Sequence, residues 1–256
     1  MKKGKLAALN IALMMLLLSV AKANESVTFP NGERIAVSLS YDDALDSQLD
    51  KVVPALNRHD LRASFYVYAS ADSFSSRLED WRAVAKFGHE LGNHSLYHVC
   101  SGSAPNRDWV AEHADLDKRS VAHMRAEISI ANSLLQALDG QTQRTFTIPC
   151  GDVNAGGKNY LPAVEDLFVA IKGMGLEDGS EVLHAPSAVD GETLINYVRN
   201  AKPGTKVVSI LFHGVGGDHL QVTEQAHEAL LQYLAKHREQ YWVDSYINIM
   251  RHMKAQ

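Results

Sequence analysis

Apolar residues recur in this chain with two spacings, one typical of strands and one typical of helices. In residues 35–42, Ile35, Val37, Leu39 and Tyr41 alternate with small or polar residues, which predicts a β-strand. Further strands are predicted at residues 63–69, just before His94, and at 144–149, 167–173, 205–213 and 240–244. Helical spacing predicts helices at residues 49–56, 78–85, 124–138, 193–200, 223–237 and 246–253.

This alternation of strands and helices indicates an α/β fold with a parallel sheet covered by helices. About seven such units that close on themselves make a (β/α) barrel, and an open doubly wound sheet is the competing arrangement. No glycine-rich phosphate-binding motif follows any predicted strand. The pattern therefore gives no indication of a nucleotide site.

The amino terminus has the three parts of a secretory signal peptide. A lysine-rich start precedes an apolar run at residues 6–20, and small residues follow at Ala21 and Ala23. We expect cleavage after Ala23, which leaves residues 24–256 as a single exported domain, periplasmic or secreted, with no stable membrane anchor. The alternative is a transmembrane anchor, but the apolar run is shorter than the roughly 20 residues that a span needs.

Charge and cysteine content narrow the classes of partner. The full chain has a formal net charge of −5, and loss of residues 1–23 removes four lysines and no acid, which gives −9. This balance, without a basic stripe, argues against nucleic-acid binding and disfavours a polyanionic substrate. The two cysteines, Cys100 and Cys150, predict one disulfide in an oxidising compartment, with two buried thiols as the alternative.

Acids and histidines gather where the predicted strands end. Asp42 and Asp43 end the first strand, His94 and His98 follow the third, and His213 ends a late apolar strand. Carboxyl ends of parallel strands share one rim, so these side chains are expected to meet. Two imidazoles four residues apart on one helical turn, together with one carboxylate, suit a catalytic metal site. The alternative is that the aspartates cap a helix and the histidines are surface residues.

Three motifs resemble those of the polysaccharide deacetylases of carbohydrate esterase family 4. The family motif T-F-D-D is similar to Ser40-Tyr41-Asp42-Asp43, and H-[ST]-x-x-H is matched by His94-Ser95-Leu96-Tyr97-His98. A late L-x-H is matched by Leu211-Phe212-His213. The resemblance runs from about residue 34 to 250. It implies a distorted (β/α) barrel with about seven parallel strands.

The resemblance also implies a divalent metal held by Asp43, His94 and His98. Zinc is expected, with cobalt, nickel and manganese as alternatives. Asp42 would be the base that takes a proton from the water activated by the metal, and His213 the acid that protonates the leaving group. Ser95 would steady the ligand loop by hydrogen bonding.

The same resemblance implies a substrate region around these residues. Leu211 would line a pocket for the acetyl methyl group, and the backbone N–H of Cys150 would help hold the oxyanion. Tyr41 and Pro149, from the first and third motifs, are expected in this region too.

The chain departs from the family at the third motif. R-x-P-[YF] is replaced by Thr147-Ile148-Pro149-Cys150, so the arginine that steadies the base is missing. Lys172 or Arg144 is a candidate for the missing cation. Asp218, in the glycine-rich segment after His213, either orients that histidine or faces solvent. A Cys100–Cys150 bond would tie the metal loop to the oxyanion loop.

The function expected from the resemblance is metal-dependent removal of N- or O-linked acetyl groups from a carbohydrate. Two other functions stay open. One is a catalytically impaired carbohydrate-binding protein on the same scaffold, since the arginine and aromatic of the third motif are missing. The other is a metal hydrolase that acts on a small amide.

Overall fold

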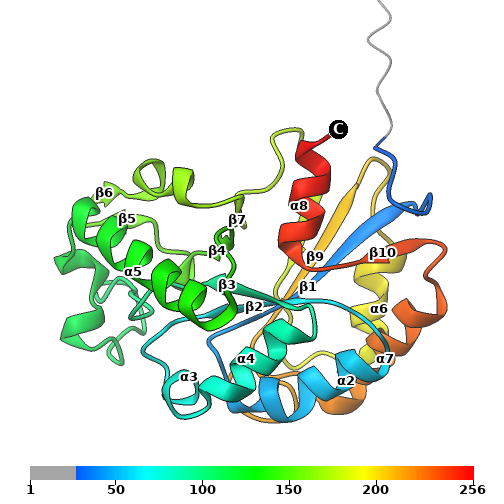
Figure 1. Ribbon diagram of the computed structural model, residues 1–256, viewed down its shortest axis with the longest axis horizontal. Helices are drawn as coiled ribbons and strands as arrows, with labels where there is room; N and C mark the ends of the chain where they lie inside the picture. Colours follow the sequence, from blue (N-terminus) through cyan, green and yellow to red (C-terminus); the bar gives the residue numbers. More distant parts are fainter. Residues whose placement is uncertain (1–26) are drawn as a thin grey trace, which may run out of the picture.

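The computed structural model describes residues 27–256, and their core is one parallel sheet (Figure 1). Seven strands follow one another in the order β7-β4-β3-β2-β1-β9-β8, and β10 also pairs with β1. All of these pairings are parallel. The strands are β1 (Ile35–Asp42), β2 (Ser64–Val67), β3 (Glu90–Asn93), β4 (Thr145–Thr147), β7 (Ala170–Lys172), β8 (Glu181–His184), β9 (Val207–Phe212) and β10 (Tyr241–Val243). The predicted distorted barrel is confirmed, and the predicted signal peptide at residues 1–23 lies outside the described residues.

Helices pack on both sides of this sheet, most of them on its outer face. They are α2 (Val53–Arg58), which continues from the π-helical turn Gln48–Val52, α3 (Asp72–Ser76), α4 (Leu78–Lys86), α5 (Val121–Asp139), α6 (Gly191–Arg199), α7 (Glu224–Lys236) and α8 (Tyr246–Lys254). A small hairpin of β5 (Asn154–Ala155) and β6 (Lys158–Asn159) lies beside α5 (Figure 1). None of the helices within residues 27–256 is both long enough and apolar enough to cross a membrane.

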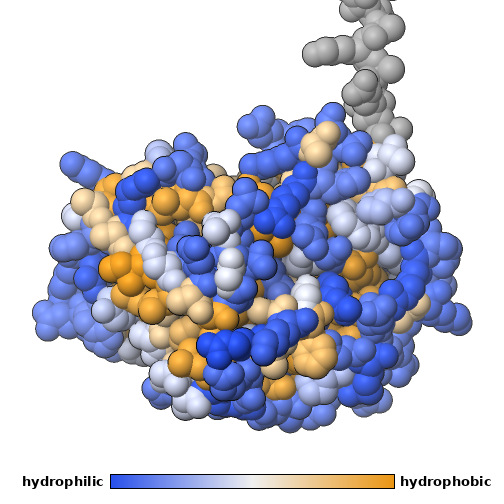
Figure 2. Space-filling model, in the orientation of Figure 1, coloured by the Kyte–Doolittle hydropathy of each residue, from blue (hydrophilic) through white to orange (hydrophobic). Residues whose placement is uncertain are grey.

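Local sequence sets the ends of the longer helices. The side chain of Ser120 accepts a hydrogen bond from the backbone N–H of His123 at the start of α5, and Gly140 ends that helix with φ 75°. Asp190 and Thr223 cap α6 and α7 in the same way. Leu134, an apolar residue on α5, is 45% exposed. Apolar residues are visible on this part of the surface (Figure 2).

The two faces of β1 differ in polarity, and this difference places the site. Val37, Leu39 and Tyr41 pack into the apolar core beneath the helices. The alternate residues, Ser38 and Ser40 among them, point to the inside of the curled sheet and are fully buried. The inner face of β1 is therefore polar from Ser38 onward, and Asp42 stands at its carboxyl end.

Contacts across the interior show how strongly the sheet curls. Lys172 lies on β7, four strands away from β1, yet its Nζ donates a hydrogen bond to the hydroxyl of Ser38 at 2.8 Å. Tyr246 of α8 lies between the two edge strands: its ring is 4.5 Å from Lys172 Nζ, and its hydroxyl bonds Glu181 of β8. The sheet is thus a half-barrel whose open side is filled by α8.

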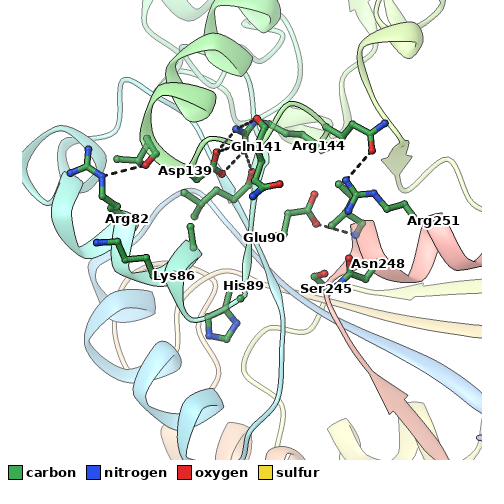
Figure 3. Close-up of a pocket in the computed structure, with 16 residues that line it drawn as sticks. Arg82, Lys86, His89, Glu90, Asp139, Gln141, Arg144, Ser245, Asn248 and Arg251 are labelled. Atoms are coloured by element: carbon green, nitrogen blue, oxygen red, sulfur yellow. Dashed lines mark hydrogen bonds and ion pairs between the residues drawn. The ribbon is translucent and has the colours of Figure 1, made fainter. Parts of the chain in front are cut away.

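A polar cluster lines a pocket at the end of the half-barrel where β3 and β4 begin (Figure 3). The buried carboxylate of Glu90 accepts hydrogen bonds from the Ser64 hydroxyl, from the backbone N–H and hydroxyl of Thr145, and from the backbone N–H of Ile247. It joins β2, β3, β4 and α8 in this way. Arg144 also lies here, paired with Asp139 at 2.7 Å.

One strand of the main sheet, β8, was not predicted from the sequence, and neither was the small hairpin of β5 and β6. β8 pairs with β9 at an edge of the sheet, and three of its four residues are only partly buried. An edge strand that is half solvated needs no long apolar run, so its pattern is weak. The contacts of β8 with β9 extend the sheet beyond the strands that the sequence predicted.

Candidate metal centre

The two aspartates reach the same place because the chain leaves the extended conformation between them. Asp42 is the last residue of β1, and Asp43 has φ 81°. On a continuous strand their carboxylates would point to opposite faces. Instead, Asp42 Oδ2 lies 3.8 Å and Asp43 Oδ1 3.2 Å from the same atom, Nε2 of His94. A left-handed conformation at a residue other than glycine costs about 1–3 kcal/mol and is typical of functional sites.

A bent loop, not a helical turn, brings His94 and His98 together. Ser95 and His98 have φ 68° and 52°, so the helical geometry considered from the sequence is wrong. The side chain of Asn93 accepts a hydrogen bond from the backbone N–H of Ser95, and the Ser95 hydroxyl accepts one from the backbone N–H of His98. The centroids of the two imidazole rings are 4.8 Å apart. Ser95 thus holds the loop by hydrogen bonding.

Asp43, His94 and His98 form a donor set that fits a divalent cation. Their ligand atoms all lie within 4.8 Å of one another, and Nε2 of each histidine is 3.1–3.2 Å from Asp43 Oδ1. His94 Nδ1 faces the carbonyl oxygen of Thr147 at 3.0 Å, which assigns the proton to Nδ1 and leaves Nε2 free to bind metal. Asp43 Oδ1 is buried and accepts no hydrogen bond from the described residues. Two imidazoles and a carboxylate are typical zinc ligands.

Burial and neighbouring charge drive the pKa values of the two aspartates apart. Burial raises the pKa of Asp42 to about 7, an effect that His94 opposes and the charge of Asp43 reinforces. Burial also disfavours ionisation of Asp43, but the hydrogen bond from His219 and the close imidazoles of His94 and His98 outweigh it, and the pKa of Asp43 falls far below its ordinary value. Asp43 is therefore the permanent anion of the pair, and Asp42 is the one suited to exchange a proton.

Two further histidines border Asp43 on its other oxygen. His213 follows β9, is largely buried, and has Nε2 at 3.8 Å from Asp43 Oδ2. Burial lowers its pKa. His219 comes from the next loop, and its Nε2 is 2.7 Å from the same oxygen. The hydrogen bond to Asp43 raises the pKa of His219.

The third motif forms the wall beside His94. Pro149 is buried, and Cys150 adopts φ 57° in the short 3-10 turn Pro149–Gly151. A disulfide joins Cys150 to Cys100, and Cys100 Sγ lies 3.6 Å from Nδ1 of His98. Because both sulfurs are bonded to each other, they are not available as thiolate ligands. The bond ties the loop that carries His98 to the loop of Cys150.

Several residues named from the sequence lie elsewhere or have other partners. Tyr41 is fully buried under the helices with its hydroxyl 2.7 Å from His227 Nε2, so its place in the substrate region is wrong. Its neighbour in the alternation, Asp42, takes the opposite face. Asp218 accepts a hydrogen bond from the backbone N–H of Ser47 and does not orient His213. Leu211 does face the interior, opposite Ser40 in register, and is half-buried.

Of the two cations considered for the missing arginine, only Lys172 lies near Asp42. Arg144 is paired with Asp139 at the other end of the half-barrel. Lys172 is buried in the interior, in register with Thr147, and its charge acts on Asp42. Burial lowers the pKa of Lys172 to about 8, while Glu181 and Asp42 favour its charged form.

Comparison with known proteins identifies the family of this chain. A family model described as polysaccharide deacetylase matches residues 30–164, more than half of the chain. The chain belongs to the polysaccharide deacetylase family. A curated relative, a gellan lyase from a Bacillus species, is 23% identical over 246 residues, and the match covers 85% of this chain. This chain spans only 9% of the length of that protein.

Three solved structures share the deacetylase fold. The peptidoglycan deacetylase PdaC from Bacillus subtilis superposes with a TM-score of 0.57 at 16% identity, over 89% of this chain and 95% of that one. A family 4 acetyl xylan esterase from Clostridium thermocellum, solved with a cobalt ion, gives 0.55 at 21% identity, over 86% and 92%. A CE4 family pseudoenzyme from Bacillus anthracis gives 0.56 at 16% identity, over 85% and 66%.

Two residues at the candidate metal centre were not assigned there from the sequence. Thr147 was noted only as a replacement for arginine, yet its hydroxyl and carbonyl both contact His94. His219 was given no role, yet its Nε2 lies 2.7 Å from Asp43 Oδ2. The signal for His219 is the segment HGVGGDH itself, because glycines that permit tight turns follow the predicted acid.

Proposed function

We propose that this chain is a metal-dependent hydrolase that removes acetyl groups from a carbohydrate. The observation that carries the proposal is the convergence of Asp42, Asp43, His94, His98 and His213 at one rim of the half-barrel. Each is a group that metal-assisted acyl hydrolysis needs, and they come from three separate strand ends. The membership in the polysaccharide deacetylase family supports the same chemistry.

Asp43, His94 and His98 are the proposed metal ligands, and zinc is the proposed ion, with cobalt, nickel and manganese as alternatives. When bound, a divalent cation lowers the pKa of a water and polarises a carbonyl. Thr147 holds the proton of His94 on Nδ1, so that Nε2 stays free for the ion.

Asp42 is the proposed general base and His213 the proposed general acid. Asp42 is buried with one oxygen, Oδ1, that accepts no hydrogen bond from the described residues, so it is free to take the proton of an attacking water. His213 lies near Asp43 Oδ2, on the side of the carboxylate away from His94 and His98. Its side chain is 21% exposed, which lets the ring reach a leaving group. The backbone N–H of Cys150 is proposed to stabilise the oxyanion, with Pro149 shaping this wall and Leu211 contacting the acetyl methyl group.

The proposed substrate is an acetylated glycan outside the cytoplasm, with N-acetyl and O-acetyl linkages both suitable. The deacetylase and esterase among the structural neighbours are named for peptidoglycan and for acetyl xylan. The signal peptide expected from the sequence favours a location in the periplasm or outside the cell. A disulfide within residues 27–256 is consistent with an oxidising compartment.

A second candidate is a carbohydrate-binding protein with impaired catalysis on the same scaffold. The replacement of the third-motif arginine and aromatic by Thr147 and Cys150 favours it, and one structural neighbour is called a pseudoenzyme. Retention of both aspartates and of His94, His98 and His213 favours an active enzyme. A hydrolase of small amides has no specific observation in its favour.

Acetate release from a panel of acetylated glycans tests the proposal. The purified protein is stripped with a chelator, reloaded with Zn²⁺ and offered chitooligosaccharides, peptidoglycan fragments and acetylated xylan. We expect activity only after reloading. Asp42→Asn should bind Zn²⁺ with little activity, whereas His94→Ala should lose Zn²⁺. Full activity in the metal-free protein would contradict the mechanism, and glycan binding without acetate release would favour the second candidate.

A further inference from the structure

The carboxylate of Asp43 has different partners on its two oxygens. Oδ1 faces Nε2 of His94 and of His98, at 3.2 and 3.1 Å. Oδ2 is 2.7 Å from Nε2 of His219, a hydrogen-bond distance, and 3.8 Å from Nε2 of His213, which is too long for one. Oδ1 is thus directed to the two histidine ligands, and Oδ2 is held by His219, which has no part in the proposed mechanism.

The loop that carries His219 is built to hold it there. The backbone N–H of Gly214 donates to the carbonyl of His219 at 3.1 Å, and Asp218 Oδ2 accepts from the backbone N–H of Ser47 at 2.9 Å. A Cβ at Gly214 would lie 2.1 Å from the carbonyl oxygen of Gly217, so only glycine allows this closure. The loop is therefore fixed at its start and immediately before His219.

Backbone conformation on both sides of His219 supports the same conclusion. Asp218 and Leu220 have φ 65° and 47°, a left-handed backbone conformation that residues other than glycine rarely adopt. Leu220 is also 54% exposed, so packing of its own side chain does not explain the conformation. The position of His219 accounts for both residues, because a reversal of the chain on each side of it directs its ring inward to Asp43.

We propose that His219 is a positioning residue that restricts Asp43 to binding the metal through Oδ1 alone. The inference rests on the metal centre of the proposed function and deepens it. An N–H at Nε2 of His219 donates to Oδ2 and occupies that oxygen. A carboxylate that binds through one oxygen leaves more positions at the ion free for water and substrate. Hydrogen bonds of this kind to ligating carboxylates also strengthen metal binding.

His219 acts through Asp43 in this proposal and takes no part in proton transfer to the substrate. The ring centroids of His213 and His219 are 5.7 Å apart, so the two histidines lie side by side at the same oxygen. Only His219 is within hydrogen-bond distance of it. The side chain of His219 is 55% exposed, against 21% for His213, so His219 forms the outer border of the site.

Zn²⁺ affinity of the metal-stripped protein, measured by competition with a chromophoric chelator, tests this role. We expect His219→Ala to weaken Zn²⁺ binding about 10- to 100-fold. His219→Gln should recover most of the affinity, because the glutamine amide places an N–H donor near the position of Nε2. His237→Ala, which removes a histidine at the end of α7, is the control and should match the wild type.

The absorption spectrum of the Co²⁺-loaded protein separates positioning from direct ligation. We expect the Co²⁺ bands of His219→Gln to match those of the wild type. Unchanged Zn²⁺ affinity in His219→Ala, with an unchanged melting temperature of the stripped protein, would overturn the proposal. Equal losses in His219→Ala and His219→Gln with altered Co²⁺ bands would overturn it too, since His219 would then be a ligand. A wild-type protein that binds no Zn²⁺ would contradict the proposed function itself.

Discussion

The hydroxyl of Thr147 lies 2.6 Å from Nδ1 of His94, and the carbonyl oxygen of Thr147 lies 3.0 Å from the same nitrogen. One residue therefore fixes both the orientation and the tautomer of a proposed metal ligand. In the family pattern this position is an arginine. In this chain the short side chain of Thr147 brings a hydroxyl to His94. The buried cation near Asp42 is instead Lys172, on the neighbouring strand β7.

Thr147→Val is expected to weaken Zn²⁺ binding by about 10-fold. This is the low end of the loss in affinity seen when a residue that hydrogen-bonds to a metal ligand is replaced. Valine keeps the shape and the backbone carbonyl but removes the hydroxyl. Thr145→Val is the matched control two residues earlier, because its hydroxyl bonds Glu90 and not the metal centre. Chelator competition measures both variants. Equal Zn²⁺ affinities for Thr147→Val and wild type would show that the carbonyl alone orients His94.

The double variant Cys100→Ser/Cys150→Ser is expected to lower the free energy of unfolding by about 4 kcal/mol. This figure is the chain-entropy estimate for a bond that spans 50 residues. Urea denaturation measures the loss, and the wild type treated with a reductant should show the same loss. A count of two free thiols in the unfolded, unreduced wild type would contradict the bond.

Acid is expected to destabilise the fold through two buried histidines. Burial lowers the pKa of His89 and of His227 to about 4 in the folded protein, from about 6.5 in the unfolded chain. Between these values only the unfolded chain takes up the protons, so this contribution to stability is complete above pH 6.5 and is lost as the pH falls towards 4. The loss is on the order of 3 kcal/mol for each histidine by pH 4.

Urea midpoints at pH 7 and pH 4.5 measure this effect. His227→Gln should be less stable than wild type at pH 7, because it loses the partner of Tyr41, but should show a smaller drop between the two pH values. His123→Gln, at an exposed position on α5, should keep the drop of the wild type. An equal drop in His227→Gln and wild type would contradict the assignment of the acid sensitivity to His227.

Most strands of the main sheet, and the rim where they end, were predictable from the sequence because the signals are local. Apolar alternation marks β1, and a parallel sheet brings the ends of its strands to one edge, so Asp42 and His213 could be placed at one rim. The same alternation also assigns Tyr41 and Asp42 to opposite faces. Placing Tyr41 in the substrate region therefore contradicted the pattern, and the structure shows it bonded to His227.

The details of the site depend on contacts between distant parts of the chain, which no local pattern contains. His219 and Asp43 are 176 residues apart, and their contact requires the tight loop that begins at Gly214. The turn between His94 and His98 is set by side-chain hydrogen bonds of Asn93 and Ser95, so spacing alone suggested the wrong conformation. The contact of Lys172 with Ser38 likewise follows from the curl of the sheet.

Glu90→Gln is expected to cost about 3 kcal/mol of stability and to leave Zn²⁺ affinity unchanged. The carboxylate accepts from the Ser64 hydroxyl, from the N–H and hydroxyl of Thr145, and from the N–H of Ile247. In glutamine, an amide NH₂ replaces one carboxylate oxygen. This NH₂ cannot accept hydrogen bonds from the N–H and hydroxyl donors around it, so these buried groups would lose their acceptor. Glu239→Gln on the surface is the control, and urea midpoints measure both. A Glu90→Gln midpoint equal to the control would mean that these bonds contribute no net stability, whereas weakened Zn²⁺ binding would mean that the cluster also supports the metal centre.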